Sequence, residues 1–442
     1  MVDSADGRTL GLGLVIISLR LYCGLGSLLF AYKFFVYRQA LPVWTYLASF
    51  MTVVGIQSWK SGSNVFRKMK DELTCVLKDV FGTPCALFYN IGRSTNHKND
   101  KNSKYDFLQV KEWLMWLSMI SMYSENYGPF STTVMFLFVL PIDVLNTIWV
   151  DVRGLNLVQS IPVVTRFIFL TFGFMQFFCI ASYLAYHRLV SHRSFQPTNR
   201  FITFIICIIG ALGGQRGPLW WASIHRRHHK YCDTKEDIHS PKIHGPFYAH
   251  AGWYVDRRHF RIDPTFVMDW LKSNPELLLI DATASIFHRY FLHYCPIVLV
   301  HMNNFILLKT KEVIGMIPHD MILLRSMAIR IMQVFLTPLT ISHASCAVLF
   351  GFILSLHFAS FTNSLCHEWV DNDNKEQPCQ AKTVAWVGYL NGGEGFHGNH
   401  HGNAKAVRHA PTGCFDSTYT VIKGMEWLGL VRIPASDREK EA

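Results

Sequence analysis

Four stretches of the chain are apolar over about 20 residues, the length that a helix needs to cross the hydrocarbon core of a bilayer. They lie at residues 130–150, 163–186, 290–308 and 341–360. Of all residues, 50% are hydrophobic and only 17% are charged, whereas an average soluble domain is about 25% charged. The sequence therefore predicts an all-α integral membrane protein with four core transmembrane helices and argues against a soluble enzyme.

Other apolar segments are too short or too interrupted to act as core spans. Residues 202–214 and 321–338 are expected to be partly buried or interfacial helices. Residues 1–112 are expected to form an N-terminal extension with a basic stretch and one or two hydrophobic segments, at 10–32 and 41–57. The first of these is long enough to be an extra membrane anchor.

The charges of the loops predict the topology, because Lys and Arg gather on the cytosolic side of membranes. Residues 60–111 carry 10 Lys/Arg against five acidic residues, and residues 187–275 are also basic, whereas the connector 151–161 has one Arg and one Asp. The four spans then form two hairpins, with a helical cap in the cytosol. This arrangement places the loop 309–330 outside. The loop carries four basic residues, so its charge fits that location poorly.

Cysteine usage and net charge limit the classes of partner. The 11 cysteines are scattered and include no Cys-x-x-Cys pair, so we expect reduced thiols rather than a disulfide framework or a thiolate zinc site. The net charge is +11, and the basic residues lie mostly between apolar runs. This pattern favours anionic lipid headgroups or an anionic substrate over nucleic acid.

The chain has 21 histidines, and nine of them stand in four short patterns. Two patterns directly follow apolar runs, and two are His-x-x-His-His. Their residues are His187 and His192; His225, His228 and His229; Asn363 and His367; and His397, His400 and His401. Positions i, i+3 and i+4 share a helix face, so these patterns can aim several imidazoles at one point. Chance would give about 0.05 His-x-x-His-His matches in such a chain.

Nine neutral imidazoles exceed what one ion accepts, so the patterns predict two metal ions. Imidazole suits iron, copper, zinc and nickel. The patterns contain no carboxylate at a matching position, which argues against the Glu-x-x-His di-iron bundle. Zinc is redox-inert and takes three or four ligands, whereas iron with O2 can attack an unactivated C–H bond. Redox chemistry on a membrane-soluble substrate is favoured. Other histidines, such as His357, are expected to have no ligand role, and His259 and His409 stay open.

At these residues the chain resembles the membrane-bound fatty acyl desaturases, specifically the Δ9 acyl-CoA desaturase-like group of the stearoyl-CoA desaturase type. That family has the same four patterns in the same order, and the resemblance runs from about residue 130 to residue 431. Supporting stretches lie at residues 214–223, 393–395, 415–419 and 422–430. The resemblance implies a di-iron centre (two Fe2+) with the nine histidines as ligands and with Asn363 acting through a bound water.

The resemblance also implies an activity for residues 113–442, the desaturase domain. It is the O2-dependent insertion of a cis double bond, at Δ9, into a saturated acyl chain carried as acyl-CoA. A bent tunnel would choose the reacting methylene pair by positioning. Because the sequence has no cytochrome b5 signature, a separate electron donor is implied: cytochrome b5 with its reductase, or ferredoxin. The implied location is the endoplasmic reticulum membrane with the active site facing the cytosol, or a plastid membrane.

Four further residues are candidates for substrate binding. Trp221 stands four residues before the second histidine pattern and could wall the acyl tunnel. Arg257 and Arg258 match a basic pair that faces the CoA phosphates in the family, and Arg216 is a weaker candidate of the same kind. Packing or a solvated surface is the alternative for each of them.

Departures from the family leave the carrier open. Gly402 and Asn403 replace an aromatic-Pro pair, and Ile224 replaces a frequent acidic residue; both changes lie near the expected headgroup. An acyl-lipid desaturase is therefore an alternative, as is a fatty-acyl or sphingolipid hydroxylase of the same superfamily. A His-rich metal transporter is a remote alternative. It should place ionisable ligands inside its spans, whereas the histidine patterns lie just outside the predicted spans.

Overall fold

The computed structural model describes residues 157–335, 339–369 and 379–435, together with five isolated positions between residues 64 and 74. The chain divides into two units, Met1–Phe136 and Leu137–Ala442, and the three described ranges belong to the second. The expected span at 130–150 and the hydrophobic segments at 10–32 and 41–57 lie outside the described residues.

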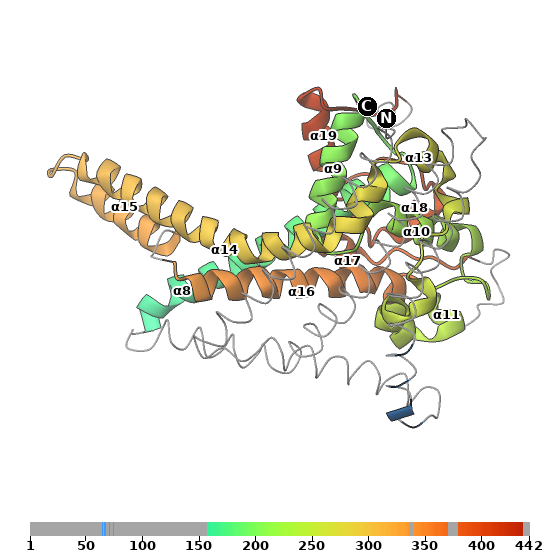
Figure 1. Ribbon diagram of the computed structural model, residues 1–442. Coiled ribbons are helices and arrows are strands. Elements are labelled where there is room, and N and C mark those ends of the chain that lie inside the picture. The colour runs from blue at the N-terminus through green and yellow to red at the C-terminus, as the bar shows by residue number, and fades with distance from the viewer. Residues whose placement is uncertain are drawn as a thin grey trace, which may run out of the picture. The chain divides into compact units, whose positions relative to one another are not determined.

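Three long helices lie side by side in the described part (Figure 1). They are α8 (Leu157–Ser182), α14 (Leu277–Gly315) and α16 (Ile341–Leu365), and α16 packs against both of the others. Among the described residues, the segments long and apolar enough to cross a membrane are Ser160–Ser191, Tyr290–Gly315 and His343–Leu365. The protein is thus mostly helical, with candidate membrane helices at three of the four predicted positions.

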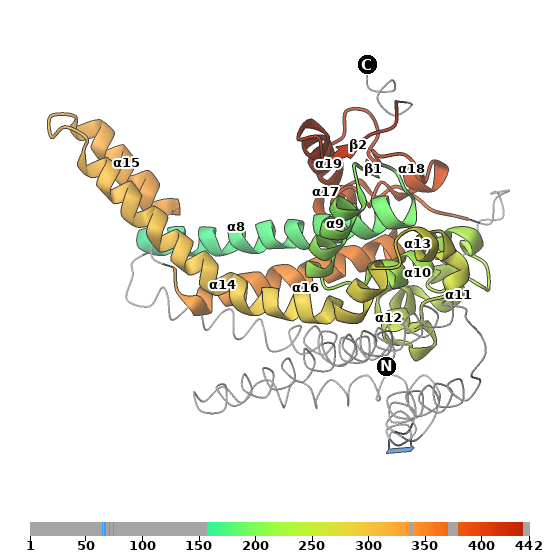
Figure 2. The same cartoon turned by 45° about the horizontal axis from the view of Figure 1, so that its top comes forward.

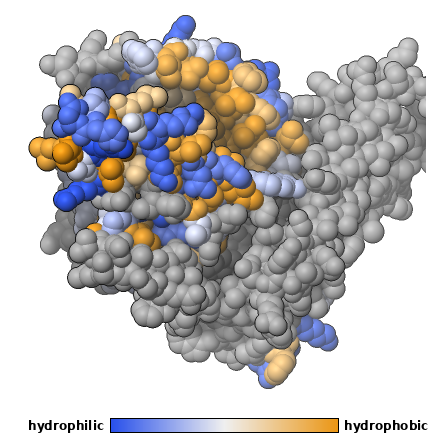
Figure 3. Space-filling model, turned by 90° about the vertical axis from the view of Figure 1, so that its left-hand side faces the viewer, coloured by the Kyte–Doolittle hydropathy of each residue, from blue (hydrophilic) through white to orange (hydrophobic). Residues whose placement is uncertain are grey.

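One of these helices extends beyond its predicted length. α14 has 39 residues, and α15 (Ile322–Phe335) folds back along its far end (Figure 2). The far end of α14 and α15 together form the α14–α15 arm. Phe305 and Leu323 on this arm are 62% and 75% exposed, which suits hydrocarbon better than water. Figure 3 views the described part from the side of the arm and shows large apolar areas between hydrophilic side chains.

The short helix α9 (Arg200–Leu212) is capped at its N-terminus by Asn199, whose side chain accepts a hydrogen bond from Ile202 N. Three apolar residues at helical spacing, Phe201, Ile205 and Ile209, are exposed along one side, while Cys207 is fully buried on the other. α9 is thus partly buried and has an exposed apolar stripe, as the sequence predicts for residues 202–214.

The helix that carries the second histidine pattern is α10 (Pro218–Tyr231). Pro218 stands at its first turn, and the next two backbone N–H groups, of Leu219 and Trp220, donate to the carboxylate of Asp281 on α14. A carboxylate at a helix N-terminus is electrostatically favourable. Asp281 therefore anchors α10 to the membrane helices.

The remaining elements form a cap of short helices at one end of the long ones (Figure 1). Two-residue strands β1 (Gln196–Pro197) and β2 (Val431–Arg432) pair antiparallel and tie the C-terminal segment to the start of α9. The other elements are α11 (Pro241–His244), η3 (Tyr248–Gly252), α12 (Trp253–Val255), η4 (Arg257–His259), η5 (Pro264–Phe266), α13 (Met268–Ser273), α17 (Ala385–Leu390), α18 (His397–Gly402) and α19 (Ser417–Trp427).

Candidate metal centre

The first histidine pattern lies on a change of helix type. α8 continues as the π-helix η2 (Tyr183–Ser191), and the N–H of His192 donates to the carbonyl of His187 at 3.2 Å. A π-helix closes its hydrogen bonds over five residues, so residues five apart lie about one turn apart. This local geometry directs both imidazoles to the same region.

The other patterns lie on α10, on α18 and just after α16. The nine histidines converge in two clusters whose ligand atoms lie within 4.8 Å of one another. The five-imidazole cluster contains His187, His192, His225, His229 and His400, and the four-imidazole cluster contains His228, His367, His397 and His401. α10 and α18 each contribute to both clusters, so the two clusters share the same two helices.

Within each cluster the Nε2 atoms face one another. The Nε2 atoms of His192 and His225 lie 2.8 Å apart, and those of His187 and His400 lie 3.0 Å apart. In the second cluster, His397 Nε2 lies 3.0 Å from His367 Nε2 and 3.1 Å from His401 Nε2. Imidazole nitrogens bound at right angles to one metal ion at about 2.1 Å are about 3 Å apart. The spacing fits metal ions.

The outer nitrogens provide a second test of the fit. His228 Nδ1 and His367 Nδ1 each lie 3.0 Å from a carboxylate, of Asp237 and Asp233 respectively. A carboxylate fixes the proton of a neutral ring on the nitrogen it contacts. The Nε2 atoms of both rings then present bare lone pairs to the cluster, and that of His228 is buried without a hydrogen-bond partner. Such lone pairs need a cation between them, and a metal ion fits.

Burial keeps these rings in the form that binds metals. Burial is the main cause that lowers the pKa of His225 and His400 well below the ordinary value and that of His229 to about 2. The neighbouring histidines lower these pKa values further. Burial alone would lower the pKa of His228 too, but Asp237 outweighs it and raises the pKa. The five-imidazole cluster is thus held neutral, as metal ligation requires.

Three acidic residues that support the rings were not among the predicted site residues. Besides Asp233 and Asp237, Glu394 lies 2.5 Å from His187 Nδ1 and 3.0 Å from His409 Nδ1. Their sequence signal is weak: two follow the second pattern closely, and Glu394 stands three residues before the third. His409, which the sequence left open, lies beside the five-imidazole cluster, with its ring centroid 4.4 Å from that of His400.

Arg188, inside the first pattern, links the cluster to the C-terminal segment. It is fully buried and donates to Glu394 Oε1, to Asp416 Oδ1 and to the carbonyls of Gly392 and Val407. A buried guanidinium is tolerated when its donors are satisfied by carboxylates. Arg188 therefore fixes Glu394, and through it the ring of His187.

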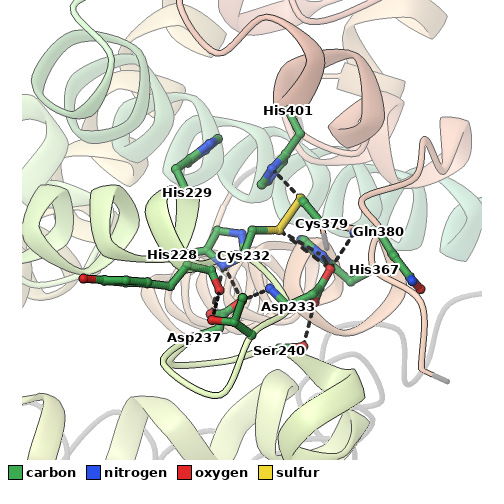
Figure 4. The surroundings of a disulfide bond; sticks show 12 residues. His228, His229, Cys232, Asp233, Asp237, Ser240, His367, Cys379, Gln380 and His401 are labelled. Carbon is green, nitrogen blue, oxygen red and sulfur yellow. Dashed lines mark hydrogen bonds and ion pairs between the residues drawn. A yellow bond between two sulfur atoms is a disulfide. The ribbon is translucent and has the colours of Figure 1, made fainter. Parts of the chain in front are cut away.

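The structure differs from the expectation of reduced thiols at one pair. Cys232, directly after α10, forms a disulfide with Cys379, and the bond lies against the four-imidazole cluster (Figure 4). The six other described cysteines are thiols. The expectation failed because the two residues are 147 positions apart, and no spacing rule connects them.

Among the other predicted residues, Asn363 lies in the last turn of α16, one turn before His367. Trp221 donates from Nε1 to Gln215 Oε1 at 3.1 Å and stacks on His225. Trp221 thus packs on the five-imidazole cluster, and Gln215 is a contact that the sequence did not single out. His357 lies outside both clusters, with its Nδ1 3.1 Å from His250 Nε2.

The three arginines lie in different surroundings. Arg216 is 1% exposed and packs its guanidinium against the rings of Trp220, Tyr254 and Phe260. The guanidinium of Arg216 is therefore enclosed by aromatic side chains and does not face a ligand at the surface. Arg258 is exposed and paired with Asp256. Arg257 lies in the same turn, η4, and its side chain is outside the described part.

An open pocket of about 290 Å³ lies beside the outer side of α10. Three arginines contribute to its wall, Arg227, Arg258 and Arg261, with one acidic residue, Asp263. The Nε atom of Arg227 is buried without a hydrogen-bond partner. The pocket is therefore suited to an anionic group.

Comparison with known proteins is consistent with this centre. The sequence profile described as fatty acid desaturase matches residues 161–407, more than half of the chain and all nine clustered histidines. The acyl-CoA C20 Δ5-desaturase of Anemone leveillei is 26% identical over 306 residues, which cover 66% of this chain and 85% of the relative. A probable chloroplastic lipid desaturase of Arabidopsis thaliana is 28% identical, with coverage of 60% and 63%. An sn-1 stearoyl-lipid 9-desaturase of a Synechocystis species is 27% identical, with 56% and 65%. The chain therefore spans less than two thirds of the last two relatives.

Proposed function

Since the chain belongs to the fatty acid desaturase family, we propose that it is an O2-dependent desaturase that inserts a cis double bond, at Δ9, into a saturated acyl chain. The observation that supports this most is the convergence of nine imidazoles in two clusters beside candidate membrane helices. We assign the clusters to two iron ions, with Asn363 near the four-imidazole cluster through a water.

The chain's own residues prepare the site. Two iron ions, when bound, supply the redox chemistry with O2 that breaks an unactivated C–H bond. Asp233 and Asp237 hold protons on the outer nitrogens of His367 and His228 and so direct the inner lone pairs. Burial shields most of the rings from water, and Trp221, stacked on His225, offers an apolar wall to the acyl chain. The position of the new bond follows from how the chain is held.

We propose acyl-CoA as the carrier, because the arginine pocket beside α10 is suited to phosphate groups. An acyl-lipid desaturase is the second candidate, and it is favoured by the pairing of Arg258 with Asp256, which already neutralises one of the cations. We further propose residues 113–442 as the desaturase domain and a separate electron donor, cytochrome b5 with its reductase or ferredoxin. The proposed location is the endoplasmic reticulum with the site facing the cytosol, or a plastid membrane.

One experiment tests the function and the metal together. The chain is produced in desaturase-deficient cells supplied with saturated acyl chains, and the new double bond is located by mass spectrometry. The purified protein should hold close to two irons per chain and the cells should gain a Δ9 product, whereas His400→Ala should give none. The inactive variant should still insert into membranes, because helix packing does not depend on that ring. Stoichiometric zinc without iron, or an active His400→Ala, would contradict the proposal.

A further inference from the structure

The disulfide between Cys232 and Cys379 has no part in the function proposed above, yet it touches the four-imidazole cluster on two sides (Figure 4). Cys379 Sγ lies 3.1 Å from His401 Nδ1, and Cys232 Sγ lies 4.0 Å from His367 Nδ1. Both sulfurs therefore lie at the outer edge of the rings that would hold the second metal.

The disulfide joins two chain segments that position this cluster. Asp233, next to Cys232, contacts His367 Nδ1 at 3.0 Å and accepts a hydrogen bond from Gln380 N at 2.8 Å. Gln380 follows Cys379 directly. One covalent bond and one hydrogen bond therefore connect the end of α10 to the segment that precedes α17. If the covalent bond is broken, the hydrogen bond between Asp233 and Gln380 still links the two segments, but the covalent constraint is lost.

The sulfur of Cys379 also has a position that matches those of the carboxylates. His401 directs Nε2 toward His397 in the cluster and Nδ1 toward Cys379. Asp237 and Asp233 occupy the equivalent place beside His228 and His367. Outer contacts of this kind orient metal-binding rings. The contact of Cys379 with His401 does not involve Cys232, so the disulfide and the contact can be tested separately by mutation.

We propose that Cys232 and Cys379 are a redox-active modification site that accepts electrons from a dithiol, and that their disulfide keeps the four-imidazole cluster assembled for its metal. This inference rests on the proposed function, because the metal is the one assigned there. Reduction then loosens the cluster and speeds the loss of its metal, while the five-imidazole cluster keeps its own.

The exchange follows from the exposure of the two sulfurs. Cys379 is half-buried and Cys232 is buried, so a thiolate of the dithiol attacks Cys379 Sγ. The S–S bond breaks, its electron pair passes to Cys232 Sγ, and that sulfur takes up a proton. The second thiol of the reductant then attacks the mixed disulfide and releases the Cys379 thiol. Two electrons and two protons reach the pair and the dithiol becomes a disulfide; a disulfide oxidant reverses the reaction.

The test uses the full-length protein, purified with iron and without reductant. One sample is treated with dithiothreitol and desalted, and alkylation with peptide mass spectrometry then reports the state of each cysteine. A ferrous chelator then removes iron from both samples, and the absorbance of the chelator–iron complex is followed over time. We expect alkylation of Cys232 and Cys379 only after reduction, and about tenfold faster loss of one of the two irons in the reduced sample. The other iron should leave at an unchanged rate.

Three variants separate the disulfide from the sulfur contact. Cys232→Ser, which keeps the sulfur beside His401, should lose iron like the reduced parent protein and should not respond to dithiothreitol. Cys379→Ala loses both features and should retain iron least. Cys414→Ser, at a free cysteine outside both clusters, is the matched control and should behave like the parent protein.

Two results would overturn the inference alone. They are alkylation of both cysteines without any reductant, and identical iron loss in the oxidised and reduced protein. A protein that binds no iron in either thiol state would instead overturn the proposed function together with this inference. Reduced parent protein provides the comparison even if a variant fails to fold.

Discussion

Each ring in the two clusters has to keep its proton on the nitrogen that faces away from its neighbours. At His228 this depends on Asp237, whose carboxylate is buried beside Nδ1. Burial alone would raise the pKa of Asp237, but the adjacent His228 outweighs it and holds the pKa below the ordinary value. The carboxylate therefore stays charged, and it fixes the ring in the tautomer that binds a metal through Nε2.

Asp237→Asn should weaken iron binding in the four-imidazole cluster. An amide accepts the Nδ1 proton less strongly and can also present its NH2 group, so the orientation and basicity of the ring both decline. We expect affinity to fall by about 10- to 100-fold, measured by chelator competition on purified protein. Glu312→Gln on the α14–α15 arm, where the carboxylate pairs only with Lys309 in the described part, is the matched control. If Asp237→Asn bound iron with unchanged affinity, Asp237 would not be needed to orient His228 for the metal.

At this scale the sequence predicted the rings but not their supports. The rare spacing of the nine histidines singles them out, whereas Asp233, Asp237 and Glu394 belong to no recurring spacing pattern. Arg216 shows a related limit: the charge of an arginine is visible in the sequence, but two of the rings packed on its guanidinium, Tyr254 and Phe260, come from a distant segment.

Individual elements differ in how far the sequence determines them. Apolar runs predicted α8 and α16 closely, because hydrocarbon length sets the length of the run. The π-helix η2 was not predicted, since apolar periodicity over nine residues does not separate it from an α-helix. The short α18 carries Gly398 and Gly402, which disfavour helix, so its helix depends on tertiary contacts. α14 exceeds its apolar run because its first turns are buried against α9 and α10.

Gly217→Ala should destabilise the junction between α10 and α14. A Cβ at this position would collide with Asp281 Oδ1 and with the Asp281 backbone, and relieving the collision would disturb the carboxylate that caps α10. We expect a loss of about 1–3 kcal/mol, measured as a lower Tm in detergent.

Gly424→Ala is the matched control for this change, because nothing lies within 4 Å of the added Cβ in the interior of α19. Ala favours helix over Gly by up to about 1 kcal/mol, so this variant should keep or raise the Tm. Equal behaviour of the two variants would contradict the role given to Asp281.

At the scale of the whole unit, the sequence established that the chain enters a membrane but left its path partly open. The four basic residues of the loop 309–330 argue for the cytosol, whereas the need to unite the histidine patterns argues for the outside. The lengths of the helices favour the outside location. Tyr290–Gly315 spans 26 residues, which is about 39 Å of helix and enough to cross. α15 has only 14 residues, about 21 Å, so we expect α16 to complete the return.

Labelling across sealed membranes should therefore divide three exposed positions into two groups. Lys235 lies after the second histidine pattern and Lys405 after the third, so both belong to the cap that holds the metal centre. Asp320 lies at the tip of the α14–α15 arm. After substitution of each by Cys, an impermeant maleimide followed by peptide mass spectrometry should label positions 235 and 405 from the same side, and position 320 only from the other. The peptide readout keeps native cysteines from confusing the result. Labelling of position 320 from the side of the cap would mean that the arm does not cross, and that the basic loop, rather than the length of α14, decides the topology.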